Sequence, residues 1–227
     1  MKKILTTIAA SLMAVSAYAN DIYVTQSGDS LDLDITQDGQ NNTVGNSTTA
    51  SASTGATTIL DIDQVGSSNV LKYQINGATF TGTVNVTGDS NDIDLNCDST
   101  NGNSSCGTVT ASITMVGGSN DVDLDIGETS DASNSTVTIT SAASDDSNVI
   151  AATVDGTSAI LTITVDGDTN NWLVDIDGNG DINGHTLIHS HTGGIADVDI
   201  VQSGVYDNYI SLTTSGDNAD IDISQTD

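Results

Sequence analysis

Glycine recurs in this chain at a fixed short interval, and that interval constrains the fold more than any other feature. The glycines that mark it are eleven residues apart within two runs: Gly66, Gly77 and Gly88, followed by Gly156, Gly167 and Gly178. A repeat this short indicates one small supersecondary unit stacked many times. We therefore expect function to belong to a stack of repeated units rather than to a single pocket.

Between the glycines, apolar and polar residues alternate with a period of two. Around Gly66, for example, Ile62 and Gln64 precede the glycine, and Asn69 and Leu71 follow it in the same phase. This alternation predicts short, half-buried strands, and the Gly-Asp-Ser and Gly-Ser-Ser segments between them predict turns. The sequence therefore predicts an all-β fold, a single-domain β-solenoid of about eight strand-turn-strand-turn coils of ~22 residues.

The Asn and Gln residues of this pattern predict buried amide ladders. When coils stack about 4.8 Å apart, each inward amide lies over its equivalent in the next coil and can donate to one neighbour while accepting from the other. The expected ladder residues are Gln26, Gln37, Asn42, Gln64, Asn69, Asn91, Asn120, Asn170, Gln202 and Gln225.

Three glycine intervals exceed multiples of eleven and predict loops that leave the solenoid. They are 27, 29 and 15 residues long and contain the Thr/Ser/Ala stretch near 48–58, a cysteine loop and a histidine segment. Cys97 and Cys106 flank a short polar stretch in the second of them. In an exported protein, this arrangement predicts a disulfide.

The N-terminus predicts export. Lys2 and Lys3 precede an apolar run that is followed by Ala17, Tyr18 and Ala19, which together are typical of a secretory signal peptide. The apolar run is too short to span a bilayer, for which roughly 20 residues are needed. We expect a signal peptide over 1–19, a repeat domain over 20–227, and a secreted protein.

Net charge excludes several kinds of partner. Without residues 1–19, Lys72 is the only Lys or Arg against 31 acidic residues, a formal net charge of −30. Nucleic acids and anionic membrane surfaces need a basic footprint that this chain lacks. The charge also opposes compact assembly, so we expect the protein to work in salt, divalent cations or acid. No arrangement of acid, base or nucleophile stands out, so we do not expect an enzyme.

Two short segments are candidates for metal binding. Asp175, Asp177, Asn179 and Asp181 fit the first half of a calcium loop of the EF-hand type, although Thr186 stands where that loop needs Glu. The alternative is that these residues are the outward side chains of an ordinary coil. Calcium is the one cofactor that the sequence suggests.

Histidines form the second candidate. His189 and His191, with His185 nearby, lie on one face of a predicted strand and suit zinc or copper. The alternative is that they line the strand without metal. A broader cation candidate is the outward carboxylate pair Asp92 and Asp94, which would stack on Asp121 and Asp123 if those coils are adjacent.

The segments Gln37–Val44 and Gln64–Leu71 resemble the curlin repeat, in which Gln-x-Gly-x-x-Asn is followed two places later by a small or apolar residue. The resemblance implies a β-solenoid subunit that builds or nucleates extracellular fibres in biofilm. On that basis we expect end-to-end self-assembly into curli-like functional amyloid. The expected partners are copies of the chain, other fibre subunits or a nucleator.

Two other functions fit the same repeats. A monomeric surface-binding solenoid would recognise a glycan or ice, and regular Thr-x-Thr columns such as Thr136, Thr138 and Thr140 would favour ice. A calcium-dependent adhesin module would instead use the acidic residues.

Overall fold

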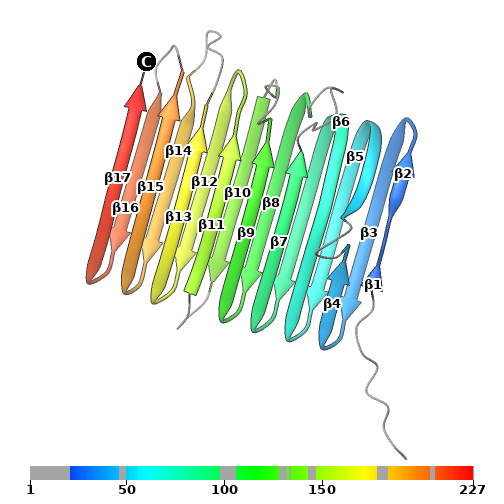
Figure 1. Cartoon of the computed structure of the whole chain (residues 1–227), viewed down its shortest axis with the longest axis horizontal. Helices are drawn as coiled ribbons and strands as arrows, with labels where there is room; N and C mark the ends of the chain where they lie inside the picture. Colours follow the sequence, from blue (N-terminus) through cyan, green and yellow to red (C-terminus); the bar gives the residue numbers. More distant parts are fainter. Residues whose placement is uncertain are drawn as a thin grey trace, which may run out of the picture.

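The computed structural model describes residues 21–45, 50–97, 106–127, 132, 134–142, 147–177, 184–204 and 208–226. These residues form strands joined by short turns and loops, stacked side by side along one long axis (Figure 1). Within them, no helix is long and apolar enough to cross a membrane. The expected signal peptide at 1–19 lies outside the described residues.

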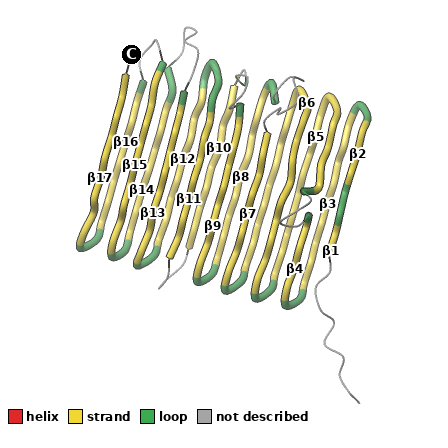
Figure 2. Tube along the Cα trace, viewed as in Figure 1, coloured by secondary structure: helices red, strands yellow, loops and turns green. Residues whose placement is uncertain are grey.

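The described residues form seventeen strands that follow one another in sequence order. They are β1 (Asp21–Ile22), β2 (Thr25–Ser27), β3 (Ser30–Asp38), β4 (Asn41–Val44), β5 (Ser51–Val65), β6 (Ser68–Thr87), β7 (Ser90–Cys97), β8 (Thr108–Val116), β9 (Ser119–Ile126), β10 (Asn134–Ala142), β11 (Ser147–Val154), β12 (Ala159–Asp166), β13 (Thr169–Ile176), β14 (Thr186–Thr192), β15 (Ile195–Ser203), β16 (Tyr209–Ser215) and β17 (Asn218–Thr226). The turns and loops gather at the two ends of each coil (Figure 2).

The strands form two parallel layers, because each strand pairs with the strand one full coil further along the chain. The first layer contains β1, β4, residues 68–74 of β6, and then β7, β9, β11, β13, β15 and β17. The second layer contains β3, residues 57–65 of β5, residues 79–87 of β6, and then β8, β10, β12, β14 and β16. The predicted all-β solenoid is confirmed, with about seven turns of about 26 residues on average.

Coil length varies because loops of different length are inserted between strands whose paired segments stay the same. Asn69 and Asn91 stack at a separation of 22 residues, the length expected from the glycine interval. Asn91 and Asn120 stack at 29 residues, and Asn120 and Asn148 at 28. The longer coils keep the same strand register, so the additional residues lie outside the paired strands.

Inward side chains of the two layers meet in a continuous apolar core. Val122 and Leu124 of the first layer and Ile113 and Ile139 of the second are at most 1% exposed. In the strands between the two ends of the stack, the burial alternates with a period of two, as in β9 and β8. This alternation is the reason that the sequence pattern predicts the strands correctly.

Glycine marks the ends of the coils because stacked backbones approach too closely there for a side chain. A Cβ atom at Gly77 would collide with the carbonyl oxygen of Gly55 in the coil before it. At the opposite end of the coil, a Cβ atom at Gly88 would collide with the carbonyl oxygen of Gly66. The eleven-residue interval thus arises because the glycines form two columns, one at each end of the coil.

Candidate functional site

A ladder of buried asparagine amides runs through the first layer, directly after the turn that precedes each strand. Asn69 Nδ2 donates to Asn91 Oδ1 at 2.9 Å, and Asn91 Nδ2 donates to Asn120 Oδ1 at 2.6 Å. The ladder continues through Asn148 to Asn170 with bonds of 2.8 and 2.7 Å. All five side chains are at most 2% exposed. Because a buried amide without a partner is costly, these bonds favour one coil spacing and one register.

Asn42 heads this column with bonds to the backbone. Its Nδ2 donates to the carbonyl oxygen of Val65 at 2.7 Å and to that of Gln37 at 3.2 Å. The amide therefore joins the turn of its own coil to the turn of the next one.

Glutamines form two short ladders, one near each end of the solenoid and in different layers. In the second layer, Gln64 Nε2 donates to Gln37 Oε1 at 2.7 Å. In the first layer, Gln225 Nε2 donates to Gln202 Oε1 at 3.1 Å. Gln26 does not stack on another amide, contrary to expectation. It lies in β2, pairs with Ser53, and donates to the carbonyl oxygen of Ser30 at 3.3 Å.

Sequence analysis missed Asn148, the fourth member of the asparagine ladder. The prediction counted positions from glycine, and no glycine lies within the five residues before Asn148. A different signal identifies it: each ladder asparagine from Asn69 to Asn170 follows Ser or Thr and opens a strand.

The asparagine ladder ends at an aromatic cluster near the C-terminus. Asn170 Nδ2 lies 3.3 Å from His191 Nδ1, and Ala196 takes the asparagine position in the next coil. The Trp172 ring packs edge-on against His189 and His191, with ring centroids 4.6 and 5.0 Å apart. Burial and, to a smaller extent, the nearby His191 together lower the pKa of His189 to about 4. This cluster replaces amide bonds with buried neutral rings.

The three histidines do not come together as one metal centre. His185 Nδ1 accepts a hydrogen bond from the backbone N–H of Ala159 at 3.1 Å, in the part of the core before β14. His189 and His191 face Trp172 further along the strand. Within the described ranges, no group of three His, Cys, Asp or Glu side chains is placed to hold a metal ion.

The predicted calcium loop is only partly described. Asp175 and Asp177 lie in and directly after β13, whereas Asn179 and Asp181 lie outside the described residues. Burial raises the pKa of Asp175, and the carboxylate of Asp177 raises it further. The calcium loop therefore stays a prediction.

Carboxylates stack on the outside of the first layer, as the sequence predicts for adjacent coils. In the pairing of β7 with β9, Asp92 lies beside Asp121 and Asp94 beside Asp123. Lys72 Nζ lies 3.5 Å from a carboxylate oxygen of both Asp92 and Asp94. Burial first, and then the neighbouring carboxylates, raise the pKa of Asp121 and Asp123. We call the outward side chains of β7, β9, β13, β15 and β17 the acidic face.

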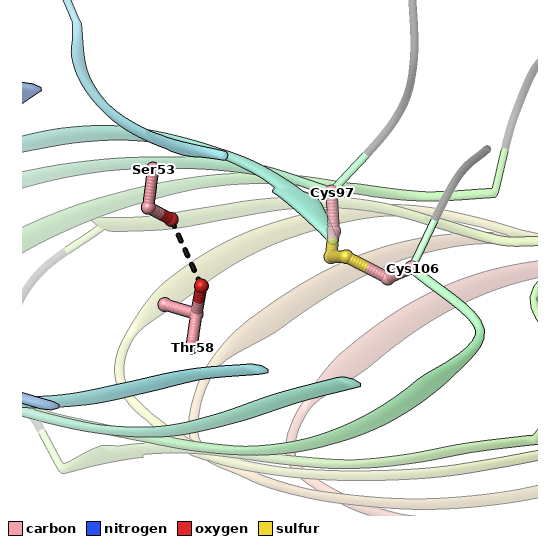
Figure 3. Close-up of a disulfide and its surroundings, with 4 residues drawn as sticks. All are labelled: Ser53, Thr58, Cys97 and Cys106. Atoms are coloured by element: carbon pink, nitrogen blue, oxygen red, sulfur yellow. Dashed lines mark hydrogen bonds between the residues drawn. A yellow bond between two sulfur atoms is a disulfide. The ribbon is translucent and has the colours of Figure 1, made fainter. Parts of the chain in front are cut away.

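The structure joins Cys97 and Cys106 by a disulfide with a Cα–Cα distance of 5.8 Å. Figure 3 shows the bridge between Cys97, at the end of β7, and Cys106, two residues before β8, on the same side of the core as Ser53 and Thr58. The hydroxyl oxygens of Ser53 and Thr58 lie 3.0 Å apart in the interior. The bridge closes the base of the loop 98–105, whose residues lie outside the described ranges.

The two ends of the solenoid expose core positions that are covered everywhere else. Ile200 and Ile223 occupy the same column, and they are 1% and 48% exposed, respectively. At the other end, Ile22, Leu31 and Leu33 are only partly buried. The difference arises because no further coil in the described chain covers β17 or β3.

Comparison with protein-family models, curated proteins and solved structures finds no match to this chain.

Proposed function

We propose that this protein is a secreted structural subunit that stacks end to end into extracellular, amyloid-like fibres of a biofilm matrix. The observation that carries the proposal is the exposure of Ile223, at a position where Ile200 is buried by the next coil. A second copy placed on β17 would bury this column again. It would also pair the backbone N–H and C=O groups that the terminal strand leaves open.

The amide ladders support the same proposal, because a ladder extends across a junction if the next copy supplies an amide. Gln225 Nε2 already donates to Gln202 and to the carbonyl oxygen of Asn208. Gln225 lies in the last described strand, so a further copy could place an amide beside it and extend the ladder. The same ends would serve for binding other fibre subunits or a nucleator.

The acidic face sets a condition on assembly. Each added copy extends columns of carboxylates spaced about 4.8 Å apart, where like charges repel unless salt screens them. We therefore expect fibres to form faster with added salt.

The test uses two lysine substitutions in the same terminal strand. Ile223→Lys places a charge on the exposed core column, whereas Ser224→Lys places the same charge at the neighbouring outward position. Fibre formation is followed by thioflavin fluorescence and electron microscopy at several salt concentrations. We expect cross-β fibres from the parent chain and Ser224→Lys, and a strong loss of fibres with Ile223→Lys. Equal assembly of the two variants, or a parent chain that stays monomeric in all conditions, would contradict the proposal.

A further inference from the structure

Threonine dominates the outward side of the second layer over four neighbouring coils. The hydroxyl-bearing and amide positions, strand by strand, are Thr81, Thr83 and Asn85 in β6; Thr110, Ser112 and Thr114 in β8; Thr136, Thr138 and Thr140 in β10; and Thr162 and Thr164 in β12. We call these residues the threonine face. They come from four coils that contain different numbers of residues, yet the parallel pairing of the strands aligns them in rows.

These residues form a two-dimensional lattice. One row runs across the coils through Thr83, Ser112, Thr138 and Thr162, which pair directly with one another. Neighbours in such a row are about 4.8 Å apart, and neighbours along a strand are roughly 6.6 Å apart. The strands stay nearly parallel from one end of the stack to the other, so the rows remain aligned (Figure 1).

The lattice is also rigid. Threonine is branched at Cβ, so its χ1 angle is restricted on a strand. Beneath Thr138, the inward neighbours Val137 and Ile139 are fully buried, and they hold the backbone in place. Each Thr or Ser of the lattice thus presents a hydroxyl and, at threonine, a methyl group at a fixed spacing. Asn85, at the edge of the lattice, presents an amide that donates to Asp63 Oδ1 at 2.9 Å.

Charge is nearly absent from the threonine face and from the strands that follow it in the second layer, whereas β5, on its other side, carries Asp61 and Asp63. From residue 79 of β6 through β16, Asp166 at the end of β12 is the one charged residue at the outward positions that the structure describes. The acidic face, by contrast, carries stacked pairs such as Asp92 with Asp121 and Asp199 with Asp222. A mobile, strongly hydrated charge would disorder the water over a surface, and this surface excludes such groups from its middle.

We propose that the threonine face binds ice. The lattice repeats in two directions at once, at about 4.8 Å across the coils and roughly 6.6 Å along the strands, and the surface of an ice crystal also repeats in two directions. The hydroxyls can hydrogen-bond to ordered water. The methyl groups form no hydrogen bonds, so they do not compete for the water molecules that lie between them. The ligand is therefore crystalline water, recognised by a rigid repeat rather than by a pocket. This activity is independent of fibre formation, because a single chain contains the whole lattice.

The test compares one substitution on each outward face. Thr138→Lys places a charge in the middle of the lattice, and Ala151→Lys places the same charge on the outward side of β11 in the first layer. Thermal hysteresis and partition into a growing ice front are measured at concentrations where size-exclusion chromatography shows monomers. Thermal denaturation by circular dichroism establishes that both variants fold.

We expect the parent chain and Ala151→Lys to bind ice and to show hysteresis, and Thr138→Lys to lose most of both. A parent chain that is excluded from ice like a non-binding globular protein would overturn the proposal. Equal loss in the two variants would also overturn it. Dimerisation of the parent chain that Thr138→Lys abolishes, without hysteresis, would instead assign the face to a second copy. Fibre formation by the parent chain in any of these cases would leave the proposed structural function standing.

Discussion

The two layers of the solenoid have the same backbone but opposite chemistry. In the first layer, an asparagine ladder lies inside and carboxylates lie outside, as at the adjacent residues Asn120 and Asp121. In the second layer, the inner columns are mainly aliphatic, as at Ile113 and Ile139, and the outer face is mainly threonine. From β7 onward, outward charge is therefore concentrated in the first layer. The second layer is almost neutral on its outside from residue 79 of β6 to β16, whereas its first strands, β3 and β5, carry outward carboxylates such as Asp34 and Asp61.

The comparison suggests why the ladder and the acidic columns share a layer. Stacked carboxylates push neighbouring coils apart, by an amount that is roughly 0.2–1 kcal/mol for a like-charged pair across strands. An amide ladder bond between the same strands draws them together with a net contribution of about 1 kcal/mol. The repulsion between Asp92 and Asp121 is thus opposed one residue away, by the bond from Asn91 to Asn120.

The largest expected effect comes from breaking the ladder. Asn120→Leu keeps a similar volume but removes bonds to Asn91, Asn148 and Ser141. Because buried amides lose their partners on both sides, we expect the free energy of unfolding to fall by about 2–5 kcal/mol. Urea denaturation measures it. Asn171→Leu, at an exposed position of the same layer, is the control and should change stability little. Similar losses in both variants would mean that the ladder adds no stability of its own.

A smaller effect on the free energy of unfolding is expected only at acidic pH, and it comes from a buried histidine in the second layer. His189 interrupts an aliphatic column of the second layer, with Ile163 before it and Leu212 after it. Its pKa is lowered from 6.5 to about 4, so the unfolded chain binds more protons than the folded chain between these values. The free energy of unfolding therefore decreases as the pH falls from about 6.5 to 4, and His189 accounts for a decrease on the order of 3 kcal/mol.

His189→Leu removes that titration and continues the aliphatic column. We expect the variant to unfold like the parent at pH 7 and to be more stable than the parent at pH 4. Chemical denaturation at both values measures the difference, and Asp residues cancel because both chains carry them. If the difference in the free energy of unfolding between the two chains is the same at pH 4 and pH 7, His189 is not the group that titrates.

Much of this architecture follows from the sequence, and each failure has a physical cause. A period of two separates inward from outward residues, so it identifies strands and most ladder members, including Asn69 and Asn91. It does not tell which layer a strand joins, because that depends on how loops of different length are placed. For this reason the sequence predicts a ladder at Gln26, which pairs with Ser53 instead. Asn148 escapes prediction for a different reason, because a longer connection without glycine replaces the usual turn before it.

The same limit applies to the outer faces. In sequence order, Asp-rich strands such as β9 alternate with Thr-rich strands such as β10, and the outward positions read as a mixture. From β7 onward, alternate strands belong to different layers, so the fold sorts them into one acidic face and one threonine face. This separation of acidic from threonine side chains becomes visible only when the strands are assigned to their layers in the folded coil.

The smallest expected effect tests the acidic face by removing one stacked charge. Asp123 pairs with Asp94, and burial and then this neighbour raise its pKa, so the ionised form opposes folding. Asp123→Asn should therefore raise the free energy of unfolding at pH 7 and low salt by roughly 0.2–1 kcal/mol. Asp38→Asn is the control, because Asp38 pairs with Val65 and has no carboxylate stacked on it there.

Salt and pH supply the decisive comparison for that variant. High salt screens the repulsion between exposed carboxylates, so the advantage of Asp123→Asn over the parent should shrink toward zero. It should shrink again as the pH falls through the raised pKa of Asp123, because the parent carboxyl is then neutral as well. Thermal melts across both series measure the difference. An advantage that persists in high salt would show that side-chain packing, and not charge, separates the two chains, and the acidic face would then impose no electrostatic cost on the stack.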